Sequence, residues 1–387
     1  MDKPVYLDYN ATTPIDPAIR EAMLSYLGEH FGNPSTNYTY GWRARQAVER
    51  AREQVASLIG AMPENITFTS GGSESDNHAI IGAALANMSK GRHIITSRIE
   101  HPAVLNTCRY LVDRLGFQVV YLPVDKYGLI DPEVVRQAVT KKTILITLMH
   151  ANNEVGTIES IEEIGGIAIE HGILFHTDAA QSCGKINVDV TRLQVDLLTI
   201  AGHKLYAPKG IGALFIRNSN YIDSFIHGAG QEKGRRAGTE NVPYIVGLGK
   251  ACQIAQHELR DHETKVKDLR DRLHARIETG LGKDLVFLNG HPERRLPNTL
   301  NISIRGIMGE ELLQQIPEIA ASTGAACHAG STTPSSVLLE MGTSKELALG
   351  ALRLTLGRWS TGEEIDMAGE LIVGRARQLL ATKSLLA

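Results

Sequence analysis

The 387-residue chain has few cysteines, little net charge and no long apolar run. Its four cysteines are too few for the disulfide framework of a secreted domain, so we expect a thiol-reducing, cytoplasmic location. The 40 Lys and Arg against 43 Asp and Glu leave a formal charge of −3, which gives no general attraction to nucleic acid or anionic lipid. No apolar stretch approaches the roughly 20 residues that span a bilayer. We therefore expect neither nucleic acid nor a membrane as a partner.

Two nucleotide-binding patterns and a metal-binding pattern are also missing. There is no G-x-G-x-x-G followed by a suitably placed acidic residue, which argues against a dehydrogenase, and no G-x-x-x-x-G-K-[ST] loop. His257-Glu258 and His262 imitate a zinc-protease motif, but the two histidines are five residues apart. That spacing turns them off a common helix face, so we assign no metal site.

Helix-like and strand-like patterns alternate from about residue 15 to residue 255. A helix is predicted over residues 41–60, because apolar residues recur there at spacings of three and four. Seven short β-rich runs follow: Ile66–Thr69, His93–Thr96, Val119–Leu122, Ile144–Leu148, Ile173–His176, Leu197–Ile200 and Ala213–Ile216. Several are apolar on both faces, as strands of a buried parallel sheet should be. The pattern predicts an α/β fold whose large domain, residues 15–255, has a mainly parallel seven-stranded sheet between helices.

The rest of the chain, residues 1–14 and 256–387, predicts a smaller α+β domain. A long charged helix is predicted over residues 251–280, and we expect the boundary between the two domains at its start or within it. The elements expected beyond it are strands near 285–288 and 299–304, a helix over 309–316 and a small-residue loop over 322–336. Two capping boxes, Thr343 with Glu346 and Thr361 with Glu364, are expected to open two further helices.

A glycine turn, Ser70-Gly71-Gly72-Ser73, joins the first strand to an Ala-rich helix. Such a turn points backbone N–H groups and the positive end of the helix dipole at an anion, so Gly72 and Ser73 are candidate phosphate contacts. Taken alone, a turn of this kind is more often a plain connection.

Two charged residues follow buried strands. Asp178 lies where α/β sheets bind ligands, and its carboxylate could pair with a pyridinium nitrogen, although a lone Asp is more commonly a helix N-cap. Lys204 lies between two strands with apolar neighbours on both sides. Turn lysines are usually solvated, but this setting favours a partly buried amine of lowered pKa that can form a Schiff base.

The loop over residues 322–336 carries one thiol, Cys327, among Gly, Ser and Thr residues. A cysteine in such a loop favours a working nucleophile, whereas most free cysteines are buried and inert. Cys108 and Cys252 are expected in helix cores, and Cys183 is assigned no role. Trp42 and Trp359 are expected to be packing residues.

Read together, these features resemble the NifS-type cysteine desulfurases and the related selenocysteine lyases. These enzymes form part of the class V aminotransferase branch of the fold type I enzymes, which use pyridoxal phosphate (PLP). The resemblance covers nearly the whole chain. The further motifs that carry it are Tyr6-Leu-Asp-Tyr-Asn-Ala-Thr-Thr-Pro, Phe31-Gly-Asn-Pro-Ser, Glu100-His101, Met149-His-Ala-Asn-Asn-Glu-Val-Gly156, Arg236-Ala-Gly-Thr-Glu-Asn, Pro297-Asn-Thr-Leu-Asn and Leu352-Arg-Leu-Thr-Leu-Gly-Arg358.

The resemblance implies that Lys204 binds PLP and that Asp178 pairs with the pyridinium nitrogen. His101 would stack on the ring and take part in proton transfer, unless it only caps the end of a strand. The other implied contacts are Gln181 and Asn153 at the phenolic oxygen, and Gly72, Ser73 and His203 at the phosphate. Thr239 would reach the phosphate of a neighbouring subunit, which implies a homodimer. Arg353, with Asn153 nearby, would hold the substrate carboxylate by a bidentate fork.

The implied activity is conversion of L-cysteine to L-alanine, with Lys204 removing the α-proton. The sulfur would leave as a persulfide on Cys327 and pass to an acceptor protein, such as an iron–sulfur scaffold or a thio-modification carrier. Ala201 and the run Gly324-Ala-Ala-Cys327-His328 are similar to selenocysteine lyases, so L-selenocysteine stays an alternative substrate. A non-enzymatic scaffold is disfavoured because Lys204 and Asp178 are both present.

Overall fold

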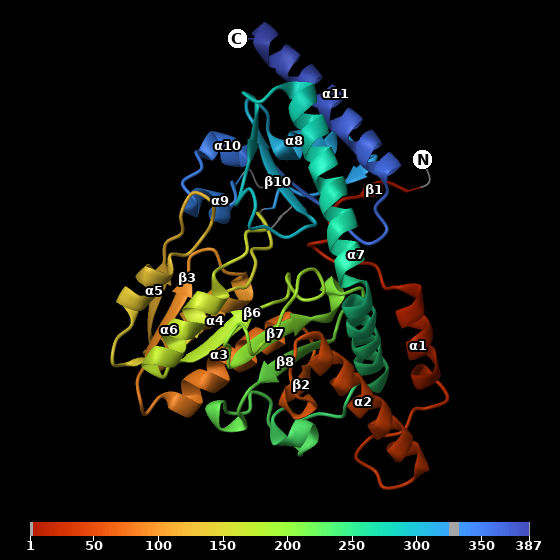
Figure 1. Ribbon diagram of the computed structural model, residues 1–387, viewed down its shortest axis with the longest axis vertical. Helices are drawn as coiled ribbons and strands as arrows, with labels where there is room; N and C mark the ends of the chain where they lie inside the picture. Colours follow the sequence, from red (N-terminus) through yellow and green to blue (C-terminus); the bar gives the residue numbers. More distant parts are fainter. Residues whose placement is uncertain (1–2, 325–332, 387) are drawn as a thin grey trace.

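The computed structural model describes residues 3–324 and 333–386, and its larger part is a seven-stranded sheet between two layers of helices (Figure 1). The strand order is β2 (Ile66–Thr69), β8 (Gly212–Ile216), β7 (Leu197–Ala201), β6 (Leu174–Asp178), β5 (Thr143–Thr147), β3 (His93–Ser97) and β4 (Gln118–Leu122). The neighbouring strands are parallel except where β8 pairs with β2 and β7. The predicted α/β fold with a mainly parallel seven-stranded sheet is confirmed.

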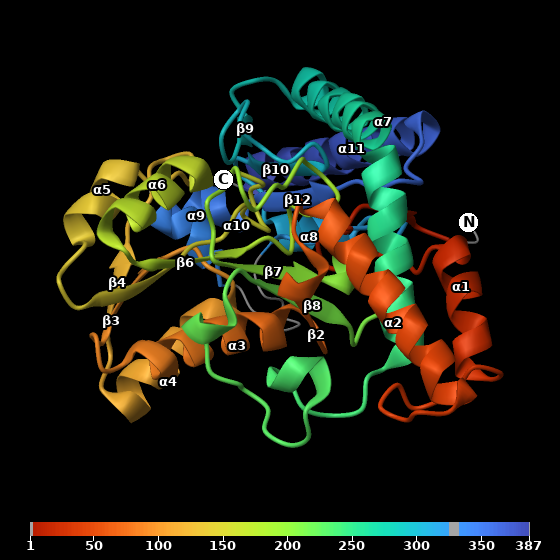
Figure 2. The same cartoon turned by 60° about the horizontal axis from the view of Figure 1, so that its bottom comes forward.

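Helices cover both faces of this sheet, as the turned view shows (Figure 2). On one face lie α3 (Gly72–Asn87) and α4 (Pro102–Leu115), which share an apolar core with the strands. The helices that share the core on the other face are α2 (Thr39–Leu58), α5 (Pro132–Ala138), α6 (Ile161–His171) and the first part of α7 (Val242–Leu281). α1 (Pro17–Leu27) packs against α7. Burial on both faces explains why the central strands carry apolar residues on both faces.

The smaller part contains an antiparallel sheet in which β10 (Thr299–Ile304) lies between β9 (Val286–Leu288) and β12 (Ala351–Thr355). β1 (Val5–Tyr6) pairs in parallel with β11 (Ile319–Ala320), which brings the N-terminal segment to this part of the molecule. Its helices are α8 (Gly309–Gln314), α9 (Ser336–Glu340), α10 (Lys345–Leu349) and α11 (Gly362–Leu386). The short 3-10 helices are η1 (Pro63–Asn65), η2 (Gly202–Lys204), η3 (Ser219–Tyr221) and η4 (Gln231–Gly234).

α7 runs along both parts (Figure 1) and takes part in two separate cores. Its residues up to Ala255 pack in the core of the large sheet, whereas Val266, Leu273 and Ile277 pack in the core of the smaller part. This change of core supports a domain boundary near residue 255, which stays a prediction. The helix begins earlier than the predicted residue 251, because Asn241 caps it by accepting the N–H of Tyr244.

The two predicted capping boxes differ in outcome. Thr361 and Glu364 cap each other's N–H groups at the start of α11, so that capping box is confirmed. The box of Thr343 with Glu346 is wrong, because Ser344 is the N-cap of α10 and its Oγ accepts the N–H of Leu347 at 3.3 Å. The hydroxyl of Ser344, one residue after Thr343, is the one that reaches the backbone N–H groups in the first turn of α10.

Trp359, Cys108 and Cys252 pack as expected, whereas Trp42 does not. Trp359 packs edge-on against Tyr206, with ring centroids 5.1 Å apart. Trp42 was expected to be a packing residue, but its side chain is 55% exposed in the single chain. Cys108 and Cys252 are buried in α4 and α7, as expected.

In the described residues, no helix is long and apolar enough to cross a membrane.

Candidate active site

A cleft of about 960 Å³ lies between the two parts of the molecule. Its walls come from the turn before α3, the end of β6, η2, the segment at residues 8–12 and β12. The carboxyl ends of parallel strands are where open α/β sheets bind ligands. The fold therefore brings the predicted residues of the large sheet together with residues of the N-terminal segment and the smaller part.

The turn before α3 has the features of an anion site. α3 begins at Gly72, and its N-cap, Gly71, has a φ of 151° that side chains rarely adopt and offers no side chain as a cap. The first N–H groups of this 16-residue helix are therefore open to the cleft, which Ser73 also lines. Space is limited, since a Cβ on Gly72 would lie 3.2 Å from the Cβ of Ala201.

Lys204 ends η2 and extends its amine into the cleft. Its Nζ donates to the backbone carbonyl of Asn10 at 2.5 Å and to that of Ala11 at 2.7 Å. Burial lowers the pKa of Lys204 to about 8, and the nearby Arg353 adds to this effect. At pH 7 about a tenth of the molecules then carry Lys204 as the neutral, nucleophilic amine, far more than for a lysine of ordinary pKa.

Asp178 is the last residue of β6 and is buried in the floor of the cleft. Its Oδ1 accepts the N–H of Ala180 at 2.9 Å in a turn, so it does not cap a helix. Burial raises the pKa of Asp178, and it also raises the pKa of neighbouring Glu100 to about 8 and that of Asp76 well above its usual range. Crowded buried carboxyls of this kind favour a cationic N–H partner in the floor.

Two histidines face the cleft with fixed hydrogen bonds. His101 is the N-cap of α4, and its Nδ1 accepts the N–H of Ala103 at 3.1 Å. The ring therefore caps a helix, not the end of a strand as weighed from the sequence, and it also lines the cleft. His203 places its Nδ1 3.2 Å from the Oγ1 of Thr12. Burial lowers the pKa of both histidines, that of His203 to about 4.

Gln181 and Asn153 also line the cleft. The Nε2 of Gln181 donates to the carbonyl of Asn10 at 3.0 Å, and its Oε1 accepts from the Nζ of Lys185 at 2.7 Å. The backbone carbonyl of Asn153 accepts from the side chains of Asn10 and Arg353. Gln181 through its side chain and Asn153 through its backbone are thus tied to the N-terminal segment.

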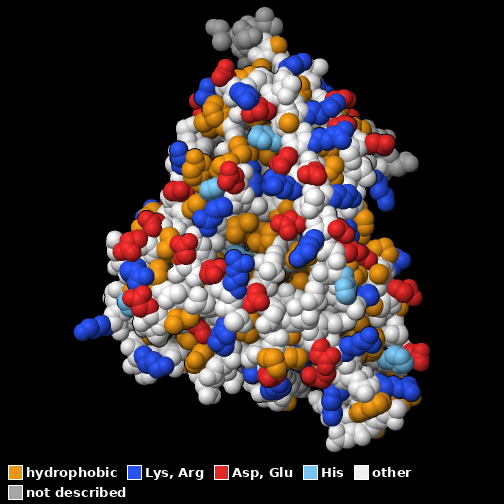
Figure 3. Space-filling view, viewed as in Figure 1, with side chains coloured by type: hydrophobic (Ala, Val, Ile, Leu, Met, Phe, Trp, Pro, Cys, Tyr) orange, Lys and Arg blue, Asp and Glu red, His pale blue; other side chains and the backbone are white. Residues whose placement is uncertain are grey.

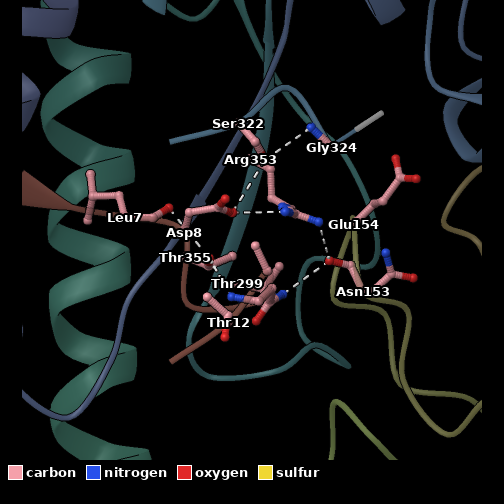
Figure 4. Close-up of polar contacts among 12 residues, drawn as sticks. Leu7, Asp8, Thr12, Asn153, Glu154, Thr299, Ser322, Gly324, Arg353 and Thr355 are labelled. Carbon is pink, nitrogen blue, oxygen red and sulfur yellow. Dashed lines mark hydrogen bonds and ion pairs between the residues drawn. The ribbon is translucent and has the colours of Figure 1, made fainter. Parts of the chain in front are cut away.

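Arg353 is buried on β12 and already has partners (Figure 4). Its Nη2 lies 2.8 Å from Asp8 Oδ1, and its Nη1 donates to the carbonyl of Asn153 at 3.3 Å. The Nε is buried without a hydrogen-bond partner in the described part of the chain. An N–H donor of this kind is open to a substrate carboxylate.

Two predicted site residues, Cys327 and Thr239, are not among the described residues that line the cleft. Cys327 and the neighbouring His328 lie outside them, although Gly324 and Thr333 on either side line the cleft. Thr239 is exposed and is not part of the cleft of its own chain.

Four residues of the site were missed as functional residues from the sequence: Asp8, Asn10, Glu154 and Lys185. Three of them stand inside motifs that carried the resemblance, so the signal was their position in those motifs. Lys185 lies outside those motifs, in the turns that follow β6, and its contact with Gln181 left no such signal in the sequence.

The residues present fit PLP. The open N–H groups at Gly72 suit a phosphate, the buried Asp178 suits a protonated ring nitrogen, and Lys204 offers an amine of lowered pKa. The unpartnered Nε of Arg353 suits the carboxylate of an amino acid. In the described part of the chain, no group of three His, Cys, Asp or Glu side chains is placed to hold a metal ion.

Comparison with known proteins agrees with this chemistry. Residues 5–367 match the family described as "Aminotransferase class-V". The protein "Cysteine desulfurase IscS" of Methanosarcina thermophila is 50% identical over 373 residues, which cover 96% of this chain and 91% of that relative.

Solved structures show the same similarity in three dimensions. A "NIFS-LIKE PROTEIN" superposes with a TM-score of 0.90 at 37% identity and covers 97% of this chain and 100% of its own. The structure "SspA in complex with cysteine" has a TM-score of 0.80 at 38% identity, over 92% of this chain and 99% of that one.

Proposed function

The chain belongs to the aminotransferase class-V family, and we propose that it is a PLP-dependent cysteine desulfurase that forms L-alanine from L-cysteine. The observation that carries the proposal is the amine of Lys204, held in a cleft with Asp178 in its floor and Arg353 in its wall. A relative named as a cysteine desulfurase shares half of its residues over nearly the whole chain. Desulfuration of cysteine uses all three groups: the amine of Lys204, the carboxylate of Asp178 and the guanidinium of Arg353.

PLP, when bound, supplies an electron sink for the charge that develops at the α-carbon of the substrate. Asp178 would hold its ring nitrogen, and the chain from Gly72 to Ser73 would hold its phosphate with His203. Asn153 and Gln181 would lie at its phenolic oxygen.

Lys204 moves the α-proton. The carbonyls of Asn10 and Ala11 fix its Nζ within the cleft, so the amine does not have to be ordered at the moment of reaction. A pKa of about 8 leaves the amine able to take a proton near neutral pH and to return it afterwards.

Arg353 binds the α-carboxylate of cysteine and so orients the α-carbon. Its guanidinium is held on two sides by Asp8 and by the carbonyl of Asn153, which leaves the Nε edge for substrate. His101 can hold a proton on Nε2, because its Nδ1 accepts the N–H of Ala103. It is our candidate for proton transfer on the face opposite the floor.

Cys327 is our candidate for the sulfur carrier. Its thiolate attacks the sulfur of the substrate, an S–S bond forms, and the C–S electron pair returns to carbon, which becomes alanine after protonation. An acceptor thiol then takes the outer sulfur. Two facts support this choice: Gly324 and Thr333, which flank residues 325–332 in the sequence, line the cleft, and the other three cysteines are buried. Burial raises the pKa of Cys108 and Cys252 to about 12, which leaves them without thiolate character.

The proposal extends to assembly and location. We propose a homodimer in which Thr239 serves the phosphate of the partner, since it lies away from the cleft of its own chain. The acceptor would be a protein thiol of an iron–sulfur or thio-modification system. A thiol-reducing cytoplasm suits a carrier thiolate. The mixed signs of the surface charges give no extended field of one sign on the face in Figure 3, which suits a small zwitterionic substrate.

The carrier is tested by labelling. Wild-type protein incubated with cysteine that carries radioactive sulfur should retain label that thiol reductants release, and Cys327→Ser should retain none.

Lys204→Ala should lose the turnover of cysteine and the visible absorbance of lysine-bound PLP, whereas Lys267→Ala, which removes an exposed lysine of α7, should keep both.

Parallel turnover of L-selenocysteine decides between the two substrates. Comparable or faster turnover of cysteine supports a desulfurase. Negligible turnover of cysteine beside rapid turnover of selenocysteine would instead make the protein a selenocysteine lyase.

A further inference from the structure

A second lysine, Lys185, is buried beside the cleft and has no part in the reaction described above. It is only 5% exposed, and its Nζ lies within hydrogen-bond distance of two amide oxygens, Gln181 Oε1 at 2.7 Å and Asn10 Oδ1 at 3.1 Å. No carboxylate pairs with it in the described part of the chain. A buried lysine without an anion is costly, so its presence at this position points to a specific task.

Asn10 is the centre of this network. Its backbone carbonyl accepts from Lys204 Nζ and from Gln181 Nε2, at 2.5 Å and 3.0 Å. Its side-chain Nδ2 donates to the carbonyl of Asn153 at 3.2 Å. A backbone carbonyl only accepts hydrogen bonds, so the side-chain amides of Gln181 and Asn10 must each turn their nitrogen toward the carbonyl that they contact. The oxygen of each amide then faces Lys185.

Lys185 therefore supplies donors to both amide oxygens. Within the described residues, a neutral amine would have both of its N–H groups satisfied by Asn10 Oδ1 and Gln181 Oε1, and the third proton of an ammonium would have no partner. Burial, with Lys204 and Arg353 adding to it, lowers the pKa of Lys185 well below its usual range, in agreement with that count.

We propose that Lys185 is a positioning residue that fixes the side-chain amide of Gln181, so that one N–H binds the carbonyl of Asn10 and the other is presented to the cleft. This inference rests on the proposed function, since it takes the cleft to be the PLP site. Gln181 is the residue proposed to meet the phenolic oxygen of PLP, and an N–H donor stabilises that oxygen in its anionic form. Lys185 then acts on the cofactor only through Gln181.

The test is a double-mutant cycle on the PLP-loaded protein, with Lys185→Met, Gln181→Leu and the double variant. The readout is the pH midpoint at which the visible absorbance of bound PLP changes. Loss of an N–H donor to an anionic oxygen disfavours the deprotonated form, so the midpoint should rise by about one pH unit in each single variant. The double variant should show the same rise as Gln181→Leu alone, because Lys185 has nothing left to orient.

Lys250→Met is the matched control, because Lys250 Nζ donates to Gln253 Oε1 at 3.0 Å on α7, away from the cleft. It should leave the midpoint unchanged. Additive shifts in the double variant, or an unchanged midpoint in Lys185→Met with normal PLP binding and thermal unfolding, would overturn the proposal. A wild-type protein that binds no PLP would contradict the proposed function instead, before the cycle is begun.

If Lys185→Met fails to fold, Lys185→Gln keeps one donor and a similar length. It should then show a smaller rise of the midpoint than Gln181→Leu. A midpoint as high as that of Gln181→Leu would overturn the proposal in this form of the experiment.

Discussion

Asp8 and Arg353 form an ion pair inside the cleft, with Asp8 Oδ1 2.8 Å from Arg353 Nη2 (Figure 4). The arginine that we propose to bind the substrate carboxylate is thus already paired with an internal carboxylate. The pair holds the guanidinium in position, but Asp8 also repels a second carboxylate that arrives beside it. The affinity of the site for amino acids is set by both effects.

Replacing Asp8 separates these effects. Asp8→Asn removes the negative charge and keeps an oxygen that can accept from Nη2, so the repulsion falls while the orientation is retained. We expect L-alanine, the product, to bind about tenfold more tightly, and to inhibit the reaction correspondingly. Its inhibition constant against cysteine measures the change. Weaker binding of alanine would mean that the charge of Asp8 is needed to orient Arg353.

Gly72 is a residue whose lack of a side chain can be tested directly. In Gly72→Ala the new Cβ would lie 3.2 Å from the Cβ of Ala201, so the turn must shift away from the position that presents its N–H groups. We expect the dissociation constant of PLP to rise about tenfold or more. Gly166→Ala in α6 is the control, since a Cβ there meets nothing within 4 Å. It should keep PLP affinity and stabilise the fold by about 0.5–1 kcal/mol.

At the scale of elements, the strands were the most predictable part of the chain. All seven predicted runs correspond to strands of one sheet. Burial on both faces leaves an apolar signal in the inner strands, whereas the edge strand β4 is partly exposed and is marked by its β-branched and aromatic residues. Gly72, Asp178 and Lys204 follow such strands, so their meeting at one edge could be anticipated. Asp8 and Asn10 could not, since their position depends on the pairing of Val5 with Ile319 near the opposite end of the chain.

Lys185 and Glu154 illustrate a second limit. Both are charged residues, and their burial is decided by the neighbours that fold around them rather than by their own segments. Burial lowers the pKa of Lys185 and raises that of Glu154. Neither these shifts nor the partners of the two residues produce a periodic pattern in the sequence.

α9 is joined to the cleft by its N-cap. Ser335 Oγ accepts the N–H of Leu338 at 3.2 Å and donates to the buried Glu154 Oε2 at 2.5 Å. Burial raises the pKa of Glu154 to about 7. Between the ordinary pKa of Glu and about 7 the folded protein therefore binds this proton more strongly than the unfolded chain, so the contribution of Glu154 to stability is lost as the pH rises through 7.

Ser335→Ala should destabilise the protein in a pH-dependent way. Loss of the cap costs about 1 kcal/mol at any pH. Above pH 7 the ionised Glu154 also loses a charge-assisted hydrogen bond, which adds about 1–2 kcal/mol. Urea unfolding at pH 6 and pH 8.5 measures the difference.

Ser344→Ala provides the comparison, because Ser344 caps the five-residue α10 in the same way without a buried carboxylate on its hydroxyl. Its cost should be the same at both pH values. An equal cost for Ser335→Ala at the two pH values would show that Glu154 does not depend on the hydroxyl.

At the scale of the whole molecule, an apolar surface on α1, the loop after it and the start of α2 remains exposed. Its members are Leu24, Leu27, Phe31, Tyr38, Tyr40 and Trp42, and Phe31 is 71% exposed. Exposed apolar groups gathered in this way are typical of a protein interface. They support the proposed homodimer, in which Trp42 would pack against the partner chain.

The proposed sharing of Thr239 between subunits makes a prediction about mixed dimers. Each site would use Lys204 of its own chain and Thr239 of the partner, so Lys204→Ala and Thr239→Ala homodimers should both have impaired sites. In a dimer of one Lys204→Ala chain with one Thr239→Ala chain, the second chain has an intact Lys204 and receives an intact Thr239. One of the two sites is then complete, and the other lacks both residues.

We expect refolded or co-expressed mixtures, purified by two different tags, to recover about half of the wild-type turnover of cysteine per dimer, since one site of the two is complete. Recovery no better than the mean of the two parent homodimers would contradict the exchange, because Thr239 would then act within its own chain or not at all. Phe31→Glu in both chains gives an independent check. It places a charge in the exposed apolar surface, so it should weaken the dimer in sedimentation and, because Thr239 then has no partner site to enter, weaken PLP retention as well.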